Sequence, residues 1–308
     1  MGTKTYFLIL LLILAAKTGA QDLQLYEMYE PGGDTANSTA FVSLSDNYPL
    51  YDYDSLAMPD VSWLTYGEAN YIKLGKPYRQ HFLKTVKISE EDKLFIYDYA
   101  NEVLATVPVK EAATVAWLND YVFGDGPFSQ SDYRIGFEIT KNQLKGIEPS
   151  PYVLVYVGKE SPFISRRLKR MDWQQIKPSE MPDVEMSAQN KAKVQEYLEG
   201  KYTFGNAYRS EAHGYVFFIQ NYAYEEESAF GRRLIALDAK TQKPVLEQFY
   251  HTSEGSMPAE LGEQWTGYLF KNKPPVLFGL EWLSFSCPEI YFLSPEHEPL
   301  YINCDNRH

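Results

Sequence analysis

The chain has 308 residues, of which 44% are hydrophobic and 23% charged, and its formal net charge at pH 7 is −12. This balance is typical of a globular protein and excludes a disordered or collagen-like chain. The length suits one large all-β domain or two ordinary domains. Because an acidic surface repels phosphate backbones, we expect no nucleic acid among the partners.

The first twenty residues have the layout of a secretory signal peptide. Lys4 lies in a short basic start, the range 6–16 is apolar, and Thr18-Gly19-Ala20 forms a small-residue cleavage site. As a helix, the apolar run spans about 16 Å, roughly half of a bilayer core, so we expect no transmembrane anchor. The sequence therefore predicts an exported protein, periplasmic or extracellular, that is cleaved after Ala20.

After the signal peptide over 1–20, we expect a loop-rich segment over 21–60 and a β-rich domain over 61–308. The loop-rich segment contains Pro, Gly and Asp clusters and little periodic pattern. The stretch near 177–187, with its prolines and methionines, is the candidate boundary for a subdivision of the β-rich domain.

Pairs of β-branched and aromatic runs, separated by polar or glycine-containing turns, predict antiparallel hairpins over most of the chain. The runs lie at 94–97 and 103–107, at 152–157, at 202–208, 215–222, 233–237 and 245–250, and at 290–293 and 300–302. The predicted fold class is mainly β, with antiparallel hairpins and meanders arranged as a propeller or a sandwich and a few short helices.

Apolar residues at helical spacing predict the short helices. Ser187 is a suitable N-cap for a helix that contains Val194, Tyr197 and Leu198 on one face and ends at Gly200. Further helices are expected over 110–120 and 161–171, and a short one from Ser256.

The two cysteines, Cys287 and Cys304, flank the last predicted hairpin. A turn centred near 295–296 places them directly opposite each other. In an oxidising compartment they should form a disulfide, which contributes about 3 kcal/mol in the chain-entropy model.

No local motif for catalysis or cofactor binding is present, including the nucleophile elbow, the zinc-protease motif and the nucleotide-binding loops. We therefore expect no cofactor and no metal, and the catalytic residues of any enzyme remain unknown. Carboxylates from distant strands leave no local pattern, so a hydrolase stays open. Glu254 is the first candidate acid, because a glycine turn displays it.

Two groups of residues are candidates for ligand binding. Tyrosine and tryptophan crowd the N-terminal quarter, where rigid rings on loops provide contact area for sugars or peptides. A dense basic cluster, placed on the outer face of the expected helix over 161–171, suits an acidic partner, an anionic glycan or a lipid headgroup. The candidates are Tyr51, Tyr53, Trp63, Arg166, Arg167, Lys169 and Arg170.

Together these features favour an exported, non-enzymatic binding or interaction protein with a protein or glycan partner. The alternative is an exported hydrolase that acts on glycans through paired carboxylates. A structural protein of the cell envelope, with no small ligand, is a third reading.

Overall fold

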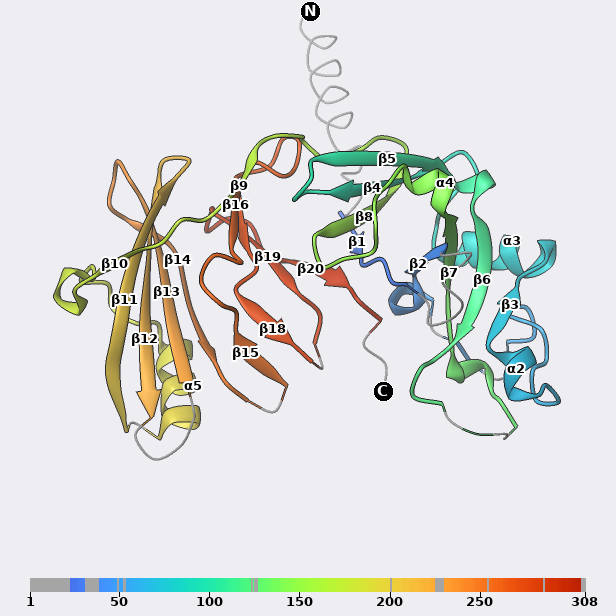
Figure 1. Cartoon of the computed structure of the whole chain (residues 1–308), viewed down its shortest axis with the longest axis horizontal. Coiled ribbons are helices and arrows are strands. Elements are labelled where there is room, and N and C mark those ends of the chain that lie inside the picture. Colours follow the sequence, from blue (N-terminus) through green and yellow to red (C-terminus); the bar gives the residue numbers. More distant parts are fainter. Residues whose placement is uncertain are drawn as a thin grey trace, which may run out of the picture.

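The computed structural model describes residues 23–30, 39–48, 50–51, 54–122, 124, 127–199, 201–224, 230–253, 255–284 and 286–305. The expected signal peptide lies outside these residues. The protein is mainly β, with 42% strand and 16% helix, and its antiparallel sheets fit a sandwich rather than a closed barrel. The predicted fold class is therefore confirmed. Figure 1 shows an elongated molecule with a nine-stranded sheet between a four-stranded sheet and a five-stranded sheet.

The nine-stranded sheet combines strands from both ends of the chain. These are β1 (Leu25–Tyr26), β4 (Lys93–Asp98), β5 (Val103–Pro108), β8 (Val153–Gly158), β9 (Leu168–Arg170), β16 (Trp265–Gly267), β17 (Val276–Phe278), β19 (Glu289–Phe292) and β20 (Leu300–Asn303). Their order across the sheet is β5-β4-β8-β1-β20-β19-β17-β16-β9. All neighbours are antiparallel except β1 and β20, which run parallel.

Three smaller sheets complete the fold. The four-stranded sheet has the order β2-β7-β6-β3 and contains β2 (Thr39–Ser43), β3 (Tyr71–Lys73), β6 (Ala113–Leu118) and β7 (Tyr133–Thr140). The five-stranded sheet follows chain order and contains β10 (Gln174–Ile176), β11 (Tyr202–Ala212), β12 (Tyr215–Tyr224), β13 (Phe230–Asp238) and β14 (Pro244–His251). The two-stranded sheet pairs β15 (Ser256–Pro258) with β18 (Glu281–Leu283).

The helices are short and lie between strands. They are α2 (Tyr66–Ala69), α3 (Lys76–Thr85), α4 (Lys141–Leu144) and α5 (Ala188–Leu198), with 3-10 turns at η3 (Ser45–Asn47), η4 (Val109–Glu111), η5 (Gln130–Asp132) and η6 (Pro178–Glu180). Within the described part of the chain, no helix has the length and apolar character needed to cross a membrane.

Helix α5 is the predicted helix that the structure confirms. The Ser187 hydroxyl accepts a hydrogen bond from the Asn190 backbone N–H (3.3 Å), as expected of an N-cap. Val194 and Leu198 pack onto β12 and β14 of the five-stranded sheet. Tyr197, expected on the same face, is 41% exposed. Gly200 lies outside the described residues.

Both faces of the nine-stranded sheet are buried, which explains the unbroken apolar runs of its strands. Successive side chains of a strand point to opposite faces. Leu94 and Ile96 of β4 therefore pack with the four-stranded sheet. Phe95 and Tyr97 point the other way, into a central core that also holds Phe278 of β17.

The same alternation continues in the C-terminal half of the sheet. Val276 lies in the central core, and its neighbour Leu277 packs against Phe217 and Leu234 of the five-stranded sheet. One face of the nine-stranded sheet thus forms a single core along its length. Its other face is divided between the two flanking sheets.

Two of the expected helices are wrong. The range 110–120 contains η4 and strand β6, and 161–171 contains strand β9. Residues four apart share a face in a helix and also in a strand, so the spacing of Ala113 and Trp117 could not distinguish a helix from a strand. Leu168 and Met171, three apart, pack in different cores.

The third error concerns Ser256, which starts strand β15 rather than a helix. Ser256 pairs with Leu283 of strand β18, 27 residues further along the chain and beyond the reach of a local pattern. The hairpins at 94–107 and 234–250 and the meander over 202–251 are confirmed.

The last hairpin forms with a register one residue away from the predicted one. Glu289 pairs with Tyr301, and Ile290 pairs with Leu300. Cys287 and Cys304 lie just beyond these pairs, and they form a disulfide with a Cα–Cα distance of 5.4 Å. The predicted disulfide is therefore present, although its cysteines are not directly opposite in the ladder.

We expect Leu25→Ala to lower the free energy of unfolding by about 2–5 kcal/mol, because Leu25 is fully buried in the central core. The matched control is Leu56→Ala, at a side chain that is 50% exposed, where a change of about 0.5 kcal/mol or less is expected. Urea denaturation of both variants measures the difference. Equal losses would contradict a structural role for Leu25 beyond that of a surface leucine.

Candidate functional site

A cavity of about 460 Å³ opens along the margin of the nine-stranded sheet that is formed by the ends of its strands. Strands β1, β4 and β17 end there, and β8 and β19 begin there. Its walls come from 27–30, 149–154, 278–283 and 288–289. These segments are distant in sequence, and the sheet brings them together because adjacent antiparallel strands start and end at the same edge.

Carboxylates dominate the polar part of this cavity, which we call the carboxylate cavity. Among the described residues that line it there is no lysine, arginine or histidine. The lining glutamates are Glu27, Glu30, Glu263, Glu281 and Glu289. A concave wall focuses the field of the charged groups that line it, so the ionised glutamates make the potential inside negative.

Aromatic rings form the apolar part of the wall. Tyr99 lies between Tyr152 and Phe278, with ring centroids at 5.9 and 5.1 Å and edge-to-face geometry in both contacts. The Tyr99 hydroxyl donates to the Pro151 carbonyl (3.1 Å), which fixes the ring. Trp282 lies in the lining and is 51% exposed. The cavity therefore combines carboxylates with aromatic side chains.

A buried amide holds the loop that carries Glu263. The side chain of Gln264 is fully buried, and its amide N–H groups donate to the carbonyls of Glu260 (2.8 Å) and Gly279 (3.0 Å). Its carbonyl accepts from the Trp173 indole N–H (3.0 Å). With its polar atoms satisfied, Gln264 fixes the loop against the segment that leads into β18.

Gly279 is required at that contact. Its φ is +76°, and a Cβ added there would lie 2.4 Å from the Glu263 carbonyl oxygen. A side chain would therefore push the Glu263 loop away from β18.

Two of the glutamates differ in their surroundings. Glu263 accepts a hydrogen bond from the Tyr152 hydroxyl (3.0 Å) and forms an ion pair with Arg170. Burial raises the pKa of Glu281 to about 7; Lys193 lowers it, and nearby Glu289 raises it further. Burial also raises the pKa of Glu27. The cavity thus contains a carboxyl group that changes charge near neutral pH.

A smaller cavity of about 240 Å³ continues from the first. The two share Glu27, Tyr29, Leu283 and Pro288 in their walls. Arg134 lines the smaller cavity, where it lies over the Tyr29 ring at 5.5 Å from the ring centroid.

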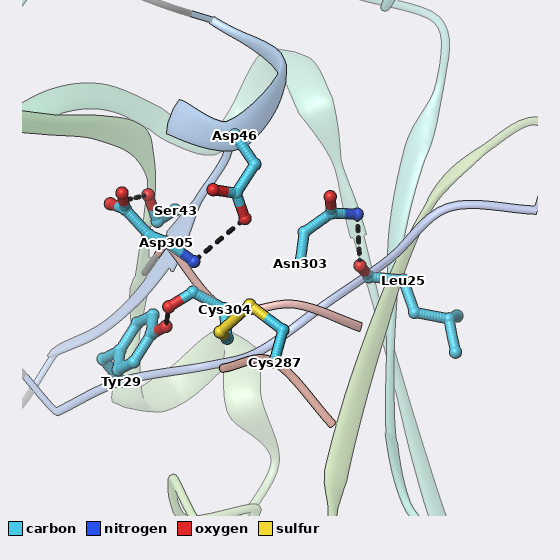
Figure 2. The surroundings of a disulfide bond; sticks show 8 residues. All are labelled: Leu25, Tyr29, Ser43, Asp46, Cys287, Asn303, Cys304 and Asp305. Carbon is cyan, nitrogen blue, oxygen red and sulfur yellow. Dashed lines mark hydrogen bonds between the residues drawn. A yellow bond between two sulfur atoms is a disulfide. The ribbon is translucent and has the colours of Figure 1, made fainter. Parts of the chain in front are cut away.

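The disulfide fixes the wall that these cavities share. Figure 2 shows the Tyr29 hydroxyl donating to the Cys304 carbonyl, next to the disulfide. The following residue, Asp305, is buried; its backbone N–H donates to Asp46 (2.9 Å), and its carboxylate accepts from the Ser43 hydroxyl (2.7 Å). The C-terminal strand is thereby tied to the N-terminal segment on which Glu27 and Tyr29 lie.

The predicted basic face does not form, because its segment is not helical. Arg166 has a left-handed φ of 61° and pairs with Glu102 (3.5 Å), whereas Arg170 pairs with Glu263. Lys169 and Arg170 are neighbours in strand β9, so their side chains point to opposite faces. The basic residues Arg166, Arg167, Lys169 and Arg170 do not line the carboxylate cavity.

Two of the predicted aromatic contacts also lie outside the cavity. Trp63 is 71% exposed and Tyr51 is 49% exposed, and neither lines the cavity. Tyr53 and Glu254 lie outside the described residues. Nothing in the structure tests these four residues as ligand contacts, so they stay predictions.

The glutamates of the cavity escaped the sequence analysis because they lack a shared local pattern. Glu27 follows a strand of two residues, and Glu281 begins a strand of three. Such short strands show no readable alternation.

Comparisons with protein-family models, with curated proteins and with solved structures give no significant match.

We expect the stability of the protein to fall as the pH rises from about 4.5 to about 7. Over this range the folded state keeps the Glu281 proton that the unfolded state, with a pKa of 4.5, has released. Glu281→Gln removes this titration, so its urea unfolding free energy should fall less between pH 5 and pH 8. Glu296→Gln, in an exposed turn, is the control and should behave like the parent. An unchanged pH profile in Glu281→Gln would contradict the raised pKa.

Proposed function

We propose that this protein binds a ligand that carries an amine or guanidinium group in the carboxylate cavity. The observation that carries the proposal is the set of five glutamates in one cavity whose described lining holds no basic side chain. A cationic group is the natural complement of such a potential, and an anion is repelled.

The aromatic wall supports the same class of ligand. Tyr99, Tyr152 and Trp282 line the cavity. Aromatic rings attract a cation through their quadrupoles and can cover the methylene stem of an amine. Tyr152 additionally orients Glu263 through its hydroxyl. A long amphipathic cation, such as a lysine or arginine side chain, fits both parts of the cavity.

We also propose that the protein is exported, with the signal peptide over 1–20 removed after Ala20. The support is the signal-peptide layout together with the disulfide between Cys287 and Cys304, which is typical of oxidising compartments. The ligand would then be met outside the cytoplasm.

Glycan hydrolysis is the second candidate. The observation that favours it is Glu281, whose pKa is about 7, close to Glu289 in an aromatic-walled cavity. A protonated carboxyl beside a second carboxyl is the pair that a glycosidase uses as acid and base. We place it second because three further glutamates share the cavity, and an oxocarbenium mechanism does not need them.

We expect n-pentylamine to raise the thermal unfolding midpoint, whereas pentanoate and 1-pentanol at the same concentration should not. The amine should bind more tightly as the pH rises from 5.5 to 8, because Glu281 loses its proton near pH 7 while the amine stays charged. Glu281→Gln should abolish most of this pH dependence, and Glu296→Gln should leave it unchanged. Isothermal titration calorimetry at each pH measures the affinity of the parent and of the two variants for the amine.

A different set of results would overturn this proposal. Equal binding of pentanoate and pentylamine would show that charge does not select the ligand. Release of reducing sugars from a polysaccharide by the parent, lost in Glu281→Gln, would instead favour the hydrolase.

Mass mapping of the exported protein under non-reducing conditions tests the proposed compartment. We expect an N-terminus at Gln21 and one peptide pair linked through Cys287 and Cys304. Retention of residues 1–20, or two free thiols, would contradict export through an oxidising compartment.

A further inference from the structure

Strand β18 has one edge without a strand partner in the part of the chain that the structure describes. Its other edge pairs with β15, through hydrogen bonds from Ser284 N–H to the Gly255 carbonyl (2.8 Å) and from Ala259 N–H to the Leu280 carbonyl (2.9 Å). Hydrogen-bonded pairs alternate along an antiparallel ladder. The backbone groups of Glu281 and Leu283 therefore point away from β15.

The position of Pro258 is consistent with the outward direction of the Glu281 backbone groups. It lies opposite Glu281, in a pair that exchanges no hydrogen bonds, so its missing N–H costs nothing in the ladder. The N–H and C=O groups of Glu281 and Leu283 have no backbone partner among the described residues.

The open edge of β18 faces the carboxylate cavity. Glu281, Trp282 and Leu283 all line this cavity, although successive side chains of a strand point to opposite faces. A cavity that contacts both faces of a strand must border one of its edges. Since β15 occupies one edge, the cavity borders the other.

We propose that this edge receives an extended peptide of a partner protein as a third, antiparallel strand, with a basic side chain of the peptide in the carboxylate cavity. The inference rests on the proposed function and names the ligand: the amine belongs to a lysine or arginine whose backbone pairs with β18. Strand addition to an open edge is a general mode of peptide binding, in which the backbone supplies affinity and alternate side chains supply specificity.

The antiparallel direction uses the edge fully. The N–H and C=O of Glu281 and of Leu283 give four main-chain hydrogen bonds in that direction. A parallel strand would reach the same groups through slanted hydrogen bonds, which are slightly less stable per residue.

The register then determines which side chains are selected. A peptide residue opposite Glu281 places its side chain beside that carboxylate, where opposite charges on facing strands attract. The residue opposite Leu283, two positions away, shares its face and should be apolar. Trp282 lies on the other face of β18 and is half exposed. The peptide residue between those opposite Glu281 and Leu283 therefore contacts the indole.

The test uses the capped peptide acetyl-Val-Thr-Lys-Thr-Val-amide, which presents an apolar residue two positions from lysine on both sides. Calorimetry should show tighter binding than for n-pentylamine under the same conditions. Replacing the peptide lysine with glutamine should weaken binding, as the charge requirement demands.

N-methylation of the peptide separates backbone pairing from charge. A methyl on the backbone nitrogen of the lysine removes an N–H that faces β18, and it should weaken binding about tenfold or more. A methyl on the threonine that precedes lysine replaces an N–H that faces away, and it is the matched control. Its binding should stay close to that of the parent peptide.

A protein variant provides the reciprocal test. Leu283→Pro removes the outward N–H while the Leu280 C=O and the Ser284 N–H keep their hydrogen bonds to β15, and it should weaken peptide binding. Leu283→Val keeps the N–H and should bind the peptide like the parent. Thermal unfolding of both variants checks that the fold is retained.

The outcomes distinguish the two proposals. If pentylamine binds but the peptide methylated on the backbone nitrogen of its lysine binds as tightly as the parent peptide, strand addition is wrong and cation binding stands. If neither pentylamine nor the peptide binds, both are wrong. Binding that weakens with the methyl on threonine but not with the methyl on lysine would overturn the antiparallel register.

Discussion

The parallel pairing of β1 with β20 joins the two halves of the molecule. Strand β1 contains only Leu25 and Tyr26, yet it is the single strand between β8 of the N-terminal half and β20 of the C-terminal half in the described sheet. Leu25 lies in the central core, and Tyr26 lies in the core shared with the four-stranded sheet. Two residues therefore contribute to both hydrophobic layers.

Hydrogen bonds outside the ladder stabilise so short a strand. The Asn303 side-chain amide donates to the Leu25 carbonyl (2.7 Å), and the Glu27 N–H donates to the Asn303 carbonyl (3.0 Å). The disulfide and the contacts of Asp305 restrain the same segment from the C-terminal side (Figure 2). The carboxylate cavity lies directly beyond this junction, so the geometry of its glutamates depends on it.

The cavity combines unfavourable neighbours, which is the usual condition of a binding site. Several carboxylates in one cavity repel each other. Burial is the main cause of the raised pKa of Glu281, and the charge of Glu289 adds to it. A bound cation would relieve the repulsion. The short β15–β18 sheet at the rim is similarly incomplete, because a two-stranded sheet is marginal in isolation.

Local patterns predicted the elements whose information is local. The hairpins that begin near 94 and 234 have both strands and the turn within a short stretch of sequence, and the Ser187 cap marks its helix directly. The expected helices over 110–120 and 161–171 failed because apolar residues four apart fit either structure. Only pairing with a distant strand decided between them.

The sequence by itself determined a mainly β protein, its main hairpins, the disulfide between Cys287 and Cys304 and one capped helix. These follow from side-chain alternation, turn chemistry and the small number of cysteines. Only the tertiary structure decided the site, because Glu27, Glu263 and Glu281 come from segments that no local pattern connects. Long-range strand pairing brings them together, and the energy that selects this pairing comes from burial of whole sheet faces rather than from any one segment.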